Sequence, residues 1–343
     1  MKIFRRKRMR LIKEGKFQEY LLYALGEVSL LVIGILIAMQ VNNMNARSKI
    51  EDQIRGTLIA LEKDLKQNIK NASDLLMWND MRDSVITNVL EKKVAKEMYQ
   101  NGEVGPLYAS FNKAAIIDEN LNKILQHEDH LGEEYASLLK ELKSYKSSII
   151  GEQEINKLFS DYSLEQGRHL TNNYHWFYDF MKGEAPEDGI NYFMNDPFYF
   201  NRLALYRILM VNNQSLNVAK RRSDEILLMS MIEEILSSEE QKSLKEILDD
   251  NGFSNCSLVS CNDSIPEDTS YQSFTNTLIQ NNLKDTLFLQ FWNNKGEAKG
   301  RLSLAPGTHL NQQISNECII EQLIDESCHQ KYKSAANTYL IFE

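Results

Sequence analysis

The sequence lacks the short motifs by which the commonest catalytic sites are identified. It contains neither a Walker-type phosphate loop, nor a Gly-x-Ser-x-Gly nucleophile elbow, nor a His-Glu-x-x-His zinc helix. Its 48 acidic side chains follow the predicted helix surfaces and form no paired pattern. The sequence therefore predicts a protein that is not an enzyme and that has no cofactor.

Acidic residues outnumber basic ones beyond the first 19 residues. The formal net charge of the chain is −9, of which residues 1–19 contribute +6 and the rest of the chain −15. An acidic bulk argues against nucleic acid as a partner, because phosphate binding needs a basic face. With 43% hydrophobic and 25% charged residues, the composition is that of a folded chain.

Residues 20–41 form the longest apolar run, in which Glu27 is the one charged side chain. These 22 residues exceed the roughly 20 that cross a bilayer as a helix. A cleaved signal peptide would have a shorter apolar region and a small-residue cleavage site, for which only Asn45-Ala46 is available. We therefore expect an uncleaved anchor, with membrane lipid as a partner.

The flanks of this run predict its orientation. Eight Lys and Arg side chains precede it, whereas Arg47 and Lys49 alone follow closely. By the positive-inside rule, residues 1–19 form a cytoplasmic basic stub and the remaining domains lie on the other side of the membrane. This stub is too short for a kinase or a DNA-binding domain, so any signal would need a separate partner.

Four residues of the anchor are candidates for helix association. Gly26, Gly34 and Ala38 are spaced by eight and four, so they share a helix face, and small residues at this spacing allow close backbone approach. Glu27 is costly within a membrane and is a functional candidate for that reason. Two interpretations stay open: Glu27 reaches the headgroups, or it lies at the interface of a homodimer.

The N-terminal region resembles an uncharacterised family of single-pass membrane proteins from Gram-negative bacteria. The resemblance covers about residues 1–45 and is carried by the runs YALGE (23–27), VIGILIA (32–38) and QVNN (40–43). The chain departs from the family pattern at Met44 and Ala46, where the family usually has Trp and Glu. The resemblance implies an inner-membrane anchor and a mostly helical periplasmic domain, and no activity.

A heptad pattern continues beyond the anchor. Apolar residues alternate in spacing between four and three, with one Asn among them: Ile54, Leu58, Leu61, Leu65, Asn68, Ala72 and Leu75. We expect this helix to end near Gln100, and a second seam to run from Ala114 to Ile149. The two seams either pack on each other within one chain or form a parallel dimeric coiled coil, whose register Asn68 would set.

The helical periplasmic domain is predicted to occupy residues 42–252. Residues 153–183 continue helically into an aromatic run at 174–178, which either packs in a core or lines a ligand pocket. A helix pair is predicted from Pro197 to Leu236. Ser237 and Glu240 have the spacing of a capping box that opens a short helix ending at Asp250.

The composition changes after residue 252. Residues 253–272 are predicted to be a linker, and residues 273–343 a small β domain with short strands at 277–279, 286–292, 301–304, 318–324 and 338–342. Residues 276–310, with the turn at Pro306-Gly307, resemble the β-domain of the von Hippel-Lindau protein, and closely spaced strands are typical of a small β-sandwich.

All four cysteines lie in the last 90 residues, at positions 256, 261, 318 and 328. In an oxidising periplasm, Cys256 and Cys261 could close a small disulfide ring, or the thiols could be free. His127 and His130 are spaced to share a metal on a helix, but no third ligand is evident, and a solvated helix end is the favoured interpretation.

The sequence therefore predicts a mainly α fold with one N-terminal transmembrane helix, a long-helix bundle and a small C-terminal β-sandwich. The favoured function is that of a membrane-anchored periplasmic protein for interaction or scaffolding, with an unidentified envelope protein as its partner. A periplasmic small-molecule sensor that signals through the anchor helix is the alternative. A hydrolase with a site assembled from distant residues is a third class.

The charge asymmetry predicts an N-in, C-out topology. A reporter that is active only in the cytoplasm, fused after Glu343, is expected to be silent, whereas a periplasm-dependent reporter at the same position should be active. Activity of the cytoplasmic reporter would contradict this orientation and the periplasmic location with it.

Overall fold

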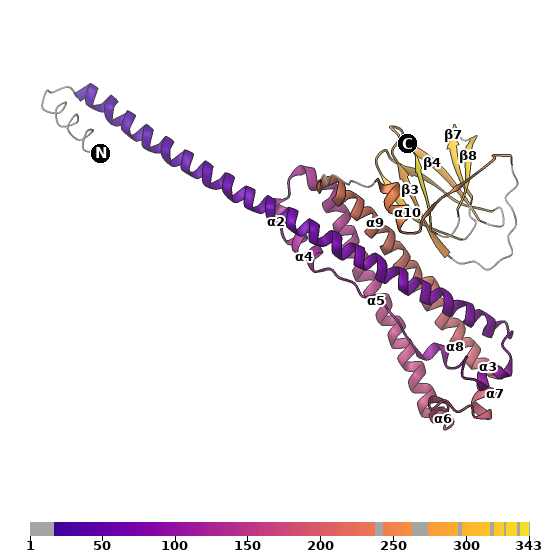
Figure 1. Cartoon of the computed structure of the whole chain (residues 1–343). Helices are drawn as coiled ribbons and strands as arrows, with labels where there is room; N and C mark the ends of the chain where they lie inside the picture. Colours follow the sequence, from indigo (N-terminus) through magenta and orange to yellow (C-terminus); the bar gives the residue numbers. More distant parts are fainter. Residues whose placement is uncertain are drawn as a thin grey trace. The chain divides into compact units, whose positions relative to one another are not determined.

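The computed structural model describes residues 17–236, 243–262, 274–293, 297–315, 319–325, 327–334 and 337–342 (Figure 1). Within these ranges the chain is mainly helical, with a sheet region at its C-terminal end. It divides into two compact units, Met1–Thr57 and Leu58–Glu343, which are taken in turn. Most of the predicted basic stub lies outside the described residues.

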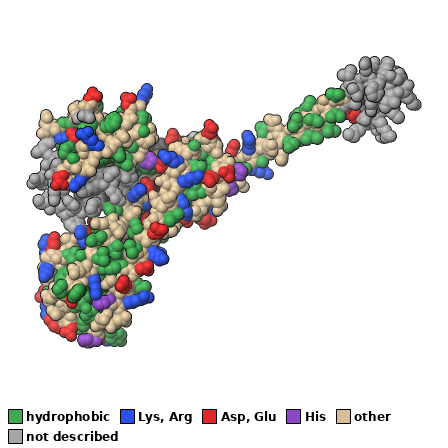
Figure 2. All heavy atoms as spheres, turned by 180° about the vertical axis from the view of Figure 1, so that it is seen from behind, with side chains coloured by type: hydrophobic (Ala, Val, Ile, Leu, Met, Phe, Trp, Pro, Cys, Tyr) green, Lys and Arg blue, Asp and Glu red, His purple; other side chains and the backbone are tan. Residues whose placement is uncertain are grey.

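The first unit contains the N-terminal part of helix α2 (Phe17–Leu90). Among the described residues, α2 is the one helix long and apolar enough to cross a membrane, with a mean hydropathy of 1.8 over its most apolar window. No part of that window is buried, and Figure 2 shows its hydrophobic side chains exposed. By length and composition, this helix can therefore span a bilayer.

The second unit begins on the same helix. There the apolar residues of the predicted heptad seam are buried against other segments of the same chain. Leu58, Leu61 and Leu65 are each at most 1% exposed. The amide of Asn68 donates to the carbonyl of Ile117 at 2.8 Å and accepts from its N–H at 2.8 Å. Asn68 therefore sets the register between two parts of one chain.

The first predicted helix ends earlier than expected, and the second begins later. Helix α2 ends at Leu90 rather than Gln100, and Lys92 takes a left-handed φ of 56° that is typical of a helix end. Residues 114–118 of the second predicted seam are not helical, and the α-helix begins at Glu119. The next elements are α3 (Lys96–Gln100), η1 (Leu107–Ala109), α4 (Glu119–Gln126), η2 (Glu128–His130), η3 (Glu133–Tyr135) and α5 (Ala136–Asn173).

The predicted helix pair from Pro197 to Leu236 is wrong, because these residues form one uninterrupted helical run. Its middle, η4 (Leu209–Ser215), is π-helical and lies between α8 (Pro197–Ile208) and α9 (Leu216–Leu236). Two short helices precede it, α6 (Phe177–Met181) and α7 (Glu187–Asn195). The absence of a break allows one helix to line the whole length of the bundle.

A capping box opens helix α10 (Leu244–Asp250), but not at the predicted residues. Ser237 and Glu240 lie outside the described residues. The box is formed by Ser243 and Glu246: the Glu246 N–H donates to the Ser243 hydroxyl at 3.3 Å, and the Ser243 N–H donates to the Glu246 carboxylate at 2.7 Å.

The C-terminal strands form two sheets, of order β1-β9-β3-β6 and β2-β8-β7-β4-β5. The strands are β1 (Ser254–Asn255), β2 (Ser257–Val259), β3 (Phe274–Asn281), β4 (Leu287–Trp292), β5 (Ala298–Leu304), β6 (His309–Ser315), β7 (Ile319–Ile324), β8 (Ser327–Lys333) and β9 (Thr338–Phe342). Residues of both sheets, such as Ile279, Leu289 and Leu340, share one buried cluster.

Strands β1 and β2 lie within the predicted linker 253–272, so the linker is shorter than expected. β1 pairs in parallel with β9, and β2 pairs antiparallel with β8. These pairings bring residues some 80 positions apart into one ladder, and no local pattern in a Ser- and Asn-rich segment indicates them. The linker was predicted from composition, whereas its pairing depends on distant strands.

The sheet region contacts the helices directly. The Tyr339 hydroxyl donates to the Asp249 carboxylate at 3.0 Å, and the Arg222 guanidinium lies 5.0 Å from the centre of the Phe253 ring. His309 Nε2 lies 3.7 Å from Glu141 of α5. Helices and sheets from Leu58 onward therefore belong to one compact unit.

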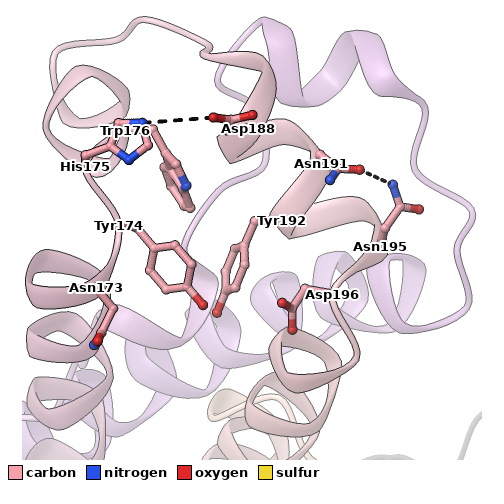
Figure 3. Close-up of a pocket in the computed structure, with 9 residues that line it drawn as sticks. All are labelled: Asn173, Tyr174, His175, Trp176, Asp188, Asn191, Tyr192, Asn195 and Asp196. Carbon is pink, nitrogen blue, oxygen red and sulfur yellow. Dashed lines mark hydrogen bonds and ion pairs between the residues drawn. The ribbon is translucent and has the colours of Figure 1, made fainter.

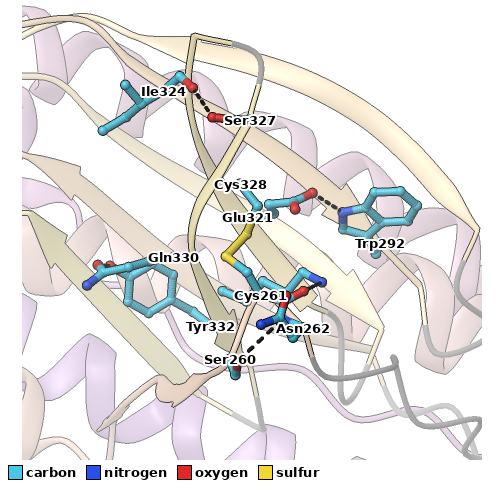
Figure 4. Close-up of a disulfide and its surroundings, with 11 residues drawn as sticks. Ser260, Cys261, Asn262, Trp292, Glu321, Ile324, Ser327, Cys328, Gln330 and Tyr332 are labelled. Carbon is cyan, nitrogen blue, oxygen red and sulfur yellow. Dashed lines mark hydrogen bonds between the residues drawn. A yellow bond between two sulfur atoms is a disulfide. The ribbon is translucent and has the colours of Figure 1, made fainter.

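The predicted Cys256–Cys261 disulfide is wrong. Cys261 is bonded to Cys328 of β8, with their Cα atoms 6.1 Å apart (Figure 4), whereas Cys256 is a buried thiol. The reason is topological: Cys256 faces the core shared by the two sheets, and Cys261 follows β2 beside β8. Lys331 holds the same segment by donating to the Cys261 carbonyl at 2.7 Å. Cys318 lies outside the described residues.

The disulfide closes a loop of 67 residues, so its loss should destabilise the protein by raising the entropy of the unfolded chain. We expect Cys261→Ser with Cys328→Ser to lower the free energy of unfolding by about 2–4 kcal/mol. Mass mapping of the non-reduced protein should find Cys261 linked to Cys328 and Cys256 alkylated only after unfolding. A Cys256–Cys261 peptide in that map would contradict the pairing.

Candidate functional site

An open pocket of about 510 Å³ lies between the C-terminal end of α5 and helix α7 (Figure 3). Its lining falls into three classes of side chain. The aromatic rings are those of Tyr174, Trp176 and Tyr192, the amides are those of Asn173, Asn191 and Asn195, and the ionisable groups are His175, Asp188 and Asp196.

The segment after α5 brings the rings to the pocket. Helix α5 ends where Tyr174 turns to an extended backbone with φ −130° and ψ 106°. Trp176 then lies directly against the backbone of α7 at Gly189, where a Cβ would lie 2.8 Å from the indole ring. Any larger residue at position 189 would force the ring and helix apart, so this glycine fixes Trp176 against α7.

Asp196 connects α7 to α8. One of its carboxylate oxygens accepts from the N–H groups of Phe198 and Tyr199, at 2.7 and 3.1 Å, and Pro197 occupies the first helical position. A side-chain cap of this kind satisfies N–H groups that the helix leaves unpaired. Asp196 therefore has a structural role in addition to its place in the pocket.

The rings of the pocket belong to a larger aromatic cluster. Tyr174 and Trp176 lie 4.6 and 5.5 Å from Tyr192, measured between ring centres. The Tyr192 hydroxyl in turn lies 2.8 Å from that of Tyr108, behind the pocket. The sequence left open whether the aromatic run packs in a core or lines a ligand pocket. Both hold: the run is part of a core, and one edge of that core lines the pocket.

The amides form the rim of the pocket and are exposed. The Asn195 amide donates to the side-chain oxygen of Asn191 at 2.8 Å, one helical turn away (Figure 3). The Asn173 amide donates to the backbone carbonyl of His169 at 2.9 Å. Each of these amides keeps further donor or acceptor capacity that a bound molecule could use.

Burial shifts the pKa of one lining residue and of one residue next to the lining. Burial raises the pKa of Tyr192, so its hydroxyl stays protonated at neutral pH. Burial lowers the pKa of His169, which lies behind Asn173 and contacts Tyr174 ring to edge at 5.6 Å. The Nε2 atom of His169 is buried and has no hydrogen-bond partner among the described residues. A neutral imidazole with one unused nitrogen therefore lies beside the pocket.

A second unusual feature is a fully buried ion cluster inside the bundle. Arg221 of α9 donates to Glu152 of α5 at 2.6 Å and also to Glu225, and all three side chains are 0% exposed. The Tyr145 hydroxyl donates to Glu225 at 2.6 Å, and Asn68 of α2 donates to that hydroxyl at 3.3 Å. The cluster therefore links α2, α5 and α9.

A second polar layer is built on the π-helical segment. Gln214 of η4 donates to the side chain of Asn156 and to the carbonyl of Asn112, both at 2.8 Å, and accepts from Asn79 at 3.1 Å. A π-helical turn shifts the side chains that follow it around the helix, and such turns are frequent at functional sites. Here Gln214 is 0% exposed and lies between α2 and α5.

Neither polar layer was predicted, although the sequence contains a signal for both. The heptad spacing of α5 continues beyond Ile149 with the buried residues Glu152, Asn156, Phe159, Ser163, Gln166 and Leu170. The pattern was followed only as far as its members were apolar. A 4-3 spacing that continues through polar residues indicates a buried polar layer as well as an apolar one.

The predicted helix-association residues lie in the first unit. Gly26, Gly34 and Ala38 are exposed, and a Cβ added to either glycine would have nothing within 4 Å. Glu27 is partly exposed on the same helix. These four residues are therefore separate from the pocket and from both polar layers.

The histidine pair of the sequence analysis is placed at a solvated helix end. His127 and His130 are exposed at the end of α4 and in η2, with ring centres 6.3 Å apart. Throughout the described ranges, no group of three or more His, Cys, Asp and Glu side chains is arranged to hold a metal ion.

Comparison of the chain with protein-family models, with curated proteins and with solved structures found no match. The resemblances at the N-terminus and in the sheet region therefore stay predictions.

Burial of Glu225 makes the stability of the bundle depend on pH. Its pKa is raised by burial from 4.5 to about 7, against the lowering effect of Arg221. A carboxyl with a higher pKa in the folded state binds its proton more tightly there, so its stabilising contribution is present below pH 4.5 and is lost as the pH rises to about 7. We expect the free energy of unfolding to fall across this window, and Glu225→Gln to reduce the fall.

Urea unfolding of both proteins across this range measures the effect. Glu234→Gln, an exposed substitution on the same helix, is the matched control and should leave the pH dependence unchanged. An equal pH dependence in wild type and Glu225→Gln would show that Glu225 titrates alike in the folded and unfolded states.

Proposed function

We propose that this protein is a single-pass membrane protein whose domain from Leu58 onward binds a partner outside the cytoplasm without catalysing a reaction. The observation that supports the proposal best is the pocket between α5 and α7. Its rings are fixed by a buried aromatic cluster, while its amides are exposed. A fixed floor with an exposed polar rim is the arrangement of a binding site, because little conformational freedom is lost when a ligand binds.

The chemistry of the lining favours binding over catalysis. No Ser, Thr, Cys or Lys side chain lines the pocket, so its nucleophilic groups are limited to two carboxylates, two tyrosine hydroxyls and the His175 imidazole. Asp196 is engaged as a helix cap, and Asp188 lies on the outer edge, 4.0 Å from the exposed His175. These carboxylates are therefore occupied or solvated rather than poised as an acid and base.

The anchor completes the proposal. The apolar part of α2 has the length and hydropathy of a membrane span, and the basic residues before it favour a cytoplasmic N-terminus. The pocket would then lie in the periplasm, with an envelope component as its ligand. The core shared by the two sheets supports a small β-sandwich at the end of this domain.

Self-association through the anchor is part of the same proposal. Gly26, Gly34 and Ala38 leave a smooth exposed face on α2, and close packing of such faces drives helix association in lipid. A homodimer would bring two copies of Glu27 together and would present two pockets to the envelope.

The polar layers support a sensor as a second candidate function. They join α2 to α5 and α9 through Asn68, Arg221 and Gln214, and the Oε1 atom of Glu152 and the Oε2 atom of Glu225 are buried without a hydrogen bond among the described residues. Buried polar groups with unused capacity can exchange partners when a helix shifts. A sensor requires that ligand binding change hydrogen exchange in α9, whereas a scaffold does not.

Photo-crosslinking tests the proposed binding site in cells that express the full chain. A photoreactive phenylalanine analogue at position 195, on the rim, is expected to form a specific adduct with an envelope component. The same analogue at position 172, an exposed asparagine of α5 that does not line the pocket, is the matched control and should form none.

Filling the pocket should abolish the adduct. In Asn191→Trp, the indole would occupy the space beside Trp176 and Tyr192, so the adduct at position 195 should be lost while the protein stays in the membrane fraction. An adduct that persists in this variant, or that forms equally at position 172, would contradict a binding role for the pocket.

A further inference from the structure

We infer that the pocket between α5 and α7 binds a neutral, hydroxyl-rich glycan. This inference rests on the proposed function and specifies the chemical class of its ligand. The lining combines exposed amides with aromatic rings and contains no aliphatic side chain and no Lys or Arg (Figure 3). Each of these properties excludes one class of ligand.

An apolar ligand is disfavoured by the composition of the lining. Pockets for apolar molecules are lined predominantly by hydrophobic side chains with few polar groups. Here amides, carboxylates and an imidazole outnumber the three rings. An apolar molecule would cover these polar groups without replacing their hydrogen bonds to water, at a cost for each group.

An anionic ligand is disfavoured by charge. Asp188 and Asp196 both line the pocket, and no cationic side chain of Lys or Arg joins them. Figure 3 shows the two carboxylates at opposite ends of the row of rings, so they do not converge on one point as a site for a small cation would require. Asp196 is also engaged by two N–H groups of α8. A neutral ligand fits this distribution best.

Hydroxyl groups of a ligand match the hydrogen-bond donors and acceptors of the amides on the rim. A sugar hydroxyl both donates and accepts, and so does the side-chain amide of Asn, whereas a carboxylate accepts and a tyrosine hydroxyl does either. Asn191 and Asn195 present paired amides from one face of α7, and Asn173 lies across the rings at the end of α5, where its amide points back along α5 to His169 (Figure 3). A ring bearing several hydroxyls can therefore contact both sides of the pocket at once.

The aromatic rings of the pocket match the C–H faces of a sugar ring. A pyranose carries C–H groups on the faces of its ring, and these pack favourably on the negative face of an aromatic side chain. Tyr174 lines the pocket and is only partly buried, so it offers such a surface. Because Tyr174 contacts Tyr192 and Trp176, its position is fixed before a ligand arrives.

His169 contacts two residues of the lining but does not itself line the pocket. Its Nε2 atom is buried without a partner among the described residues, and its ring contacts Tyr174 and the amide of Asn173. Buried polar atoms are nearly always paired, so this unpaired nitrogen is a place for an ordered water rather than for a ligand in the pocket. The volume of about 510 Å³ lies within the range of about 300–1,000 Å³ of ligand pockets.

Calorimetric titration of the full chain in lipid nanodiscs tests the inference. The neutral probes are maltotriose and tri-N-acetylchitotriose, trigalacturonate is the anionic counterpart, and spermidine is the cationic probe. We expect at least one neutral glycan to bind with a Kd below about 1 mM, and trigalacturonate and spermidine to bind more weakly.

The variants assign the binding to the pocket. Asn191→Ala and Asn173→Ala should each weaken glycan binding about three- to tenfold, the loss expected for one hydrogen bond. Asn172→Ala, the neighbouring exposed asparagine outside the lining, should bind as wild type does. All three positions are exposed, and a thermal unfolding curve for each variant confirms that it is folded.

Several results would overturn the inference. One is that neither neutral glycan binds at about 10 mM, a concentration tenfold above the expected Kd limit. Another is that trigalacturonate or spermidine binds more tightly than the neutral glycans. A third is that Asn172→Ala loses as much affinity as the pocket variants. If glycan binding fails while the photo-adduct at position 195 still forms, the ligand class is wrong and the binding function stands. Loss of both removes the binding function as well.

Discussion

The pairing of buried Arg221 with Glu152 and Glu225 is the constraint on which the helical bundle depends. A charged group that is removed from water must be compensated by partners, and leaving the buried Arg221 guanidinium unpaired would cost about 3–5 kcal/mol. The partners come from α5 and α9, and Tyr145 and Asn68 extend the cluster to α2. A shift of any of these helices by one heptad position would break the cluster, whereas an all-apolar seam would tolerate it.

The register set by these polar layers has a consequence for the pocket. Once α2, α5 and α9 are aligned, the aromatic cluster that contains Phe159, Tyr192 and Tyr206 fills one end of the bundle. The close contact of Trp176 with Gly189 then holds α7 against the end of α5. The pocket is therefore a product of the same packing, and the amides of its rim are left exposed to solvent or a ligand.

The bounds of helices and strands were predictable where they depend on neighbouring residues in the sequence. They were less predictable where they depend on pairing with distant strands. The strand from Thr338 to Phe342 was predicted with its observed bounds. Strand β6 and strand β8 were not predicted, because their side chains alternate poorly in polarity and their pairing depends on β3 and β7. The disulfide failed for the same reason: sequence proximity favoured Cys256, but the strand order brings Cys328 to Cys261.

The sequence by itself determined the apolar span of α2, the heptad seam from Leu58 and the mainly helical class, because each depends on a periodicity or a run of local residues. Only the tertiary structure decided that Glu152 and Asn156 continue the seam as buried polar layers. It also decided that Asn173 and Asn191, 18 positions apart, line one pocket. The physical reason is that a polar side chain is compatible with solvent or with a buried partner, and only the packed fold supplies that partner.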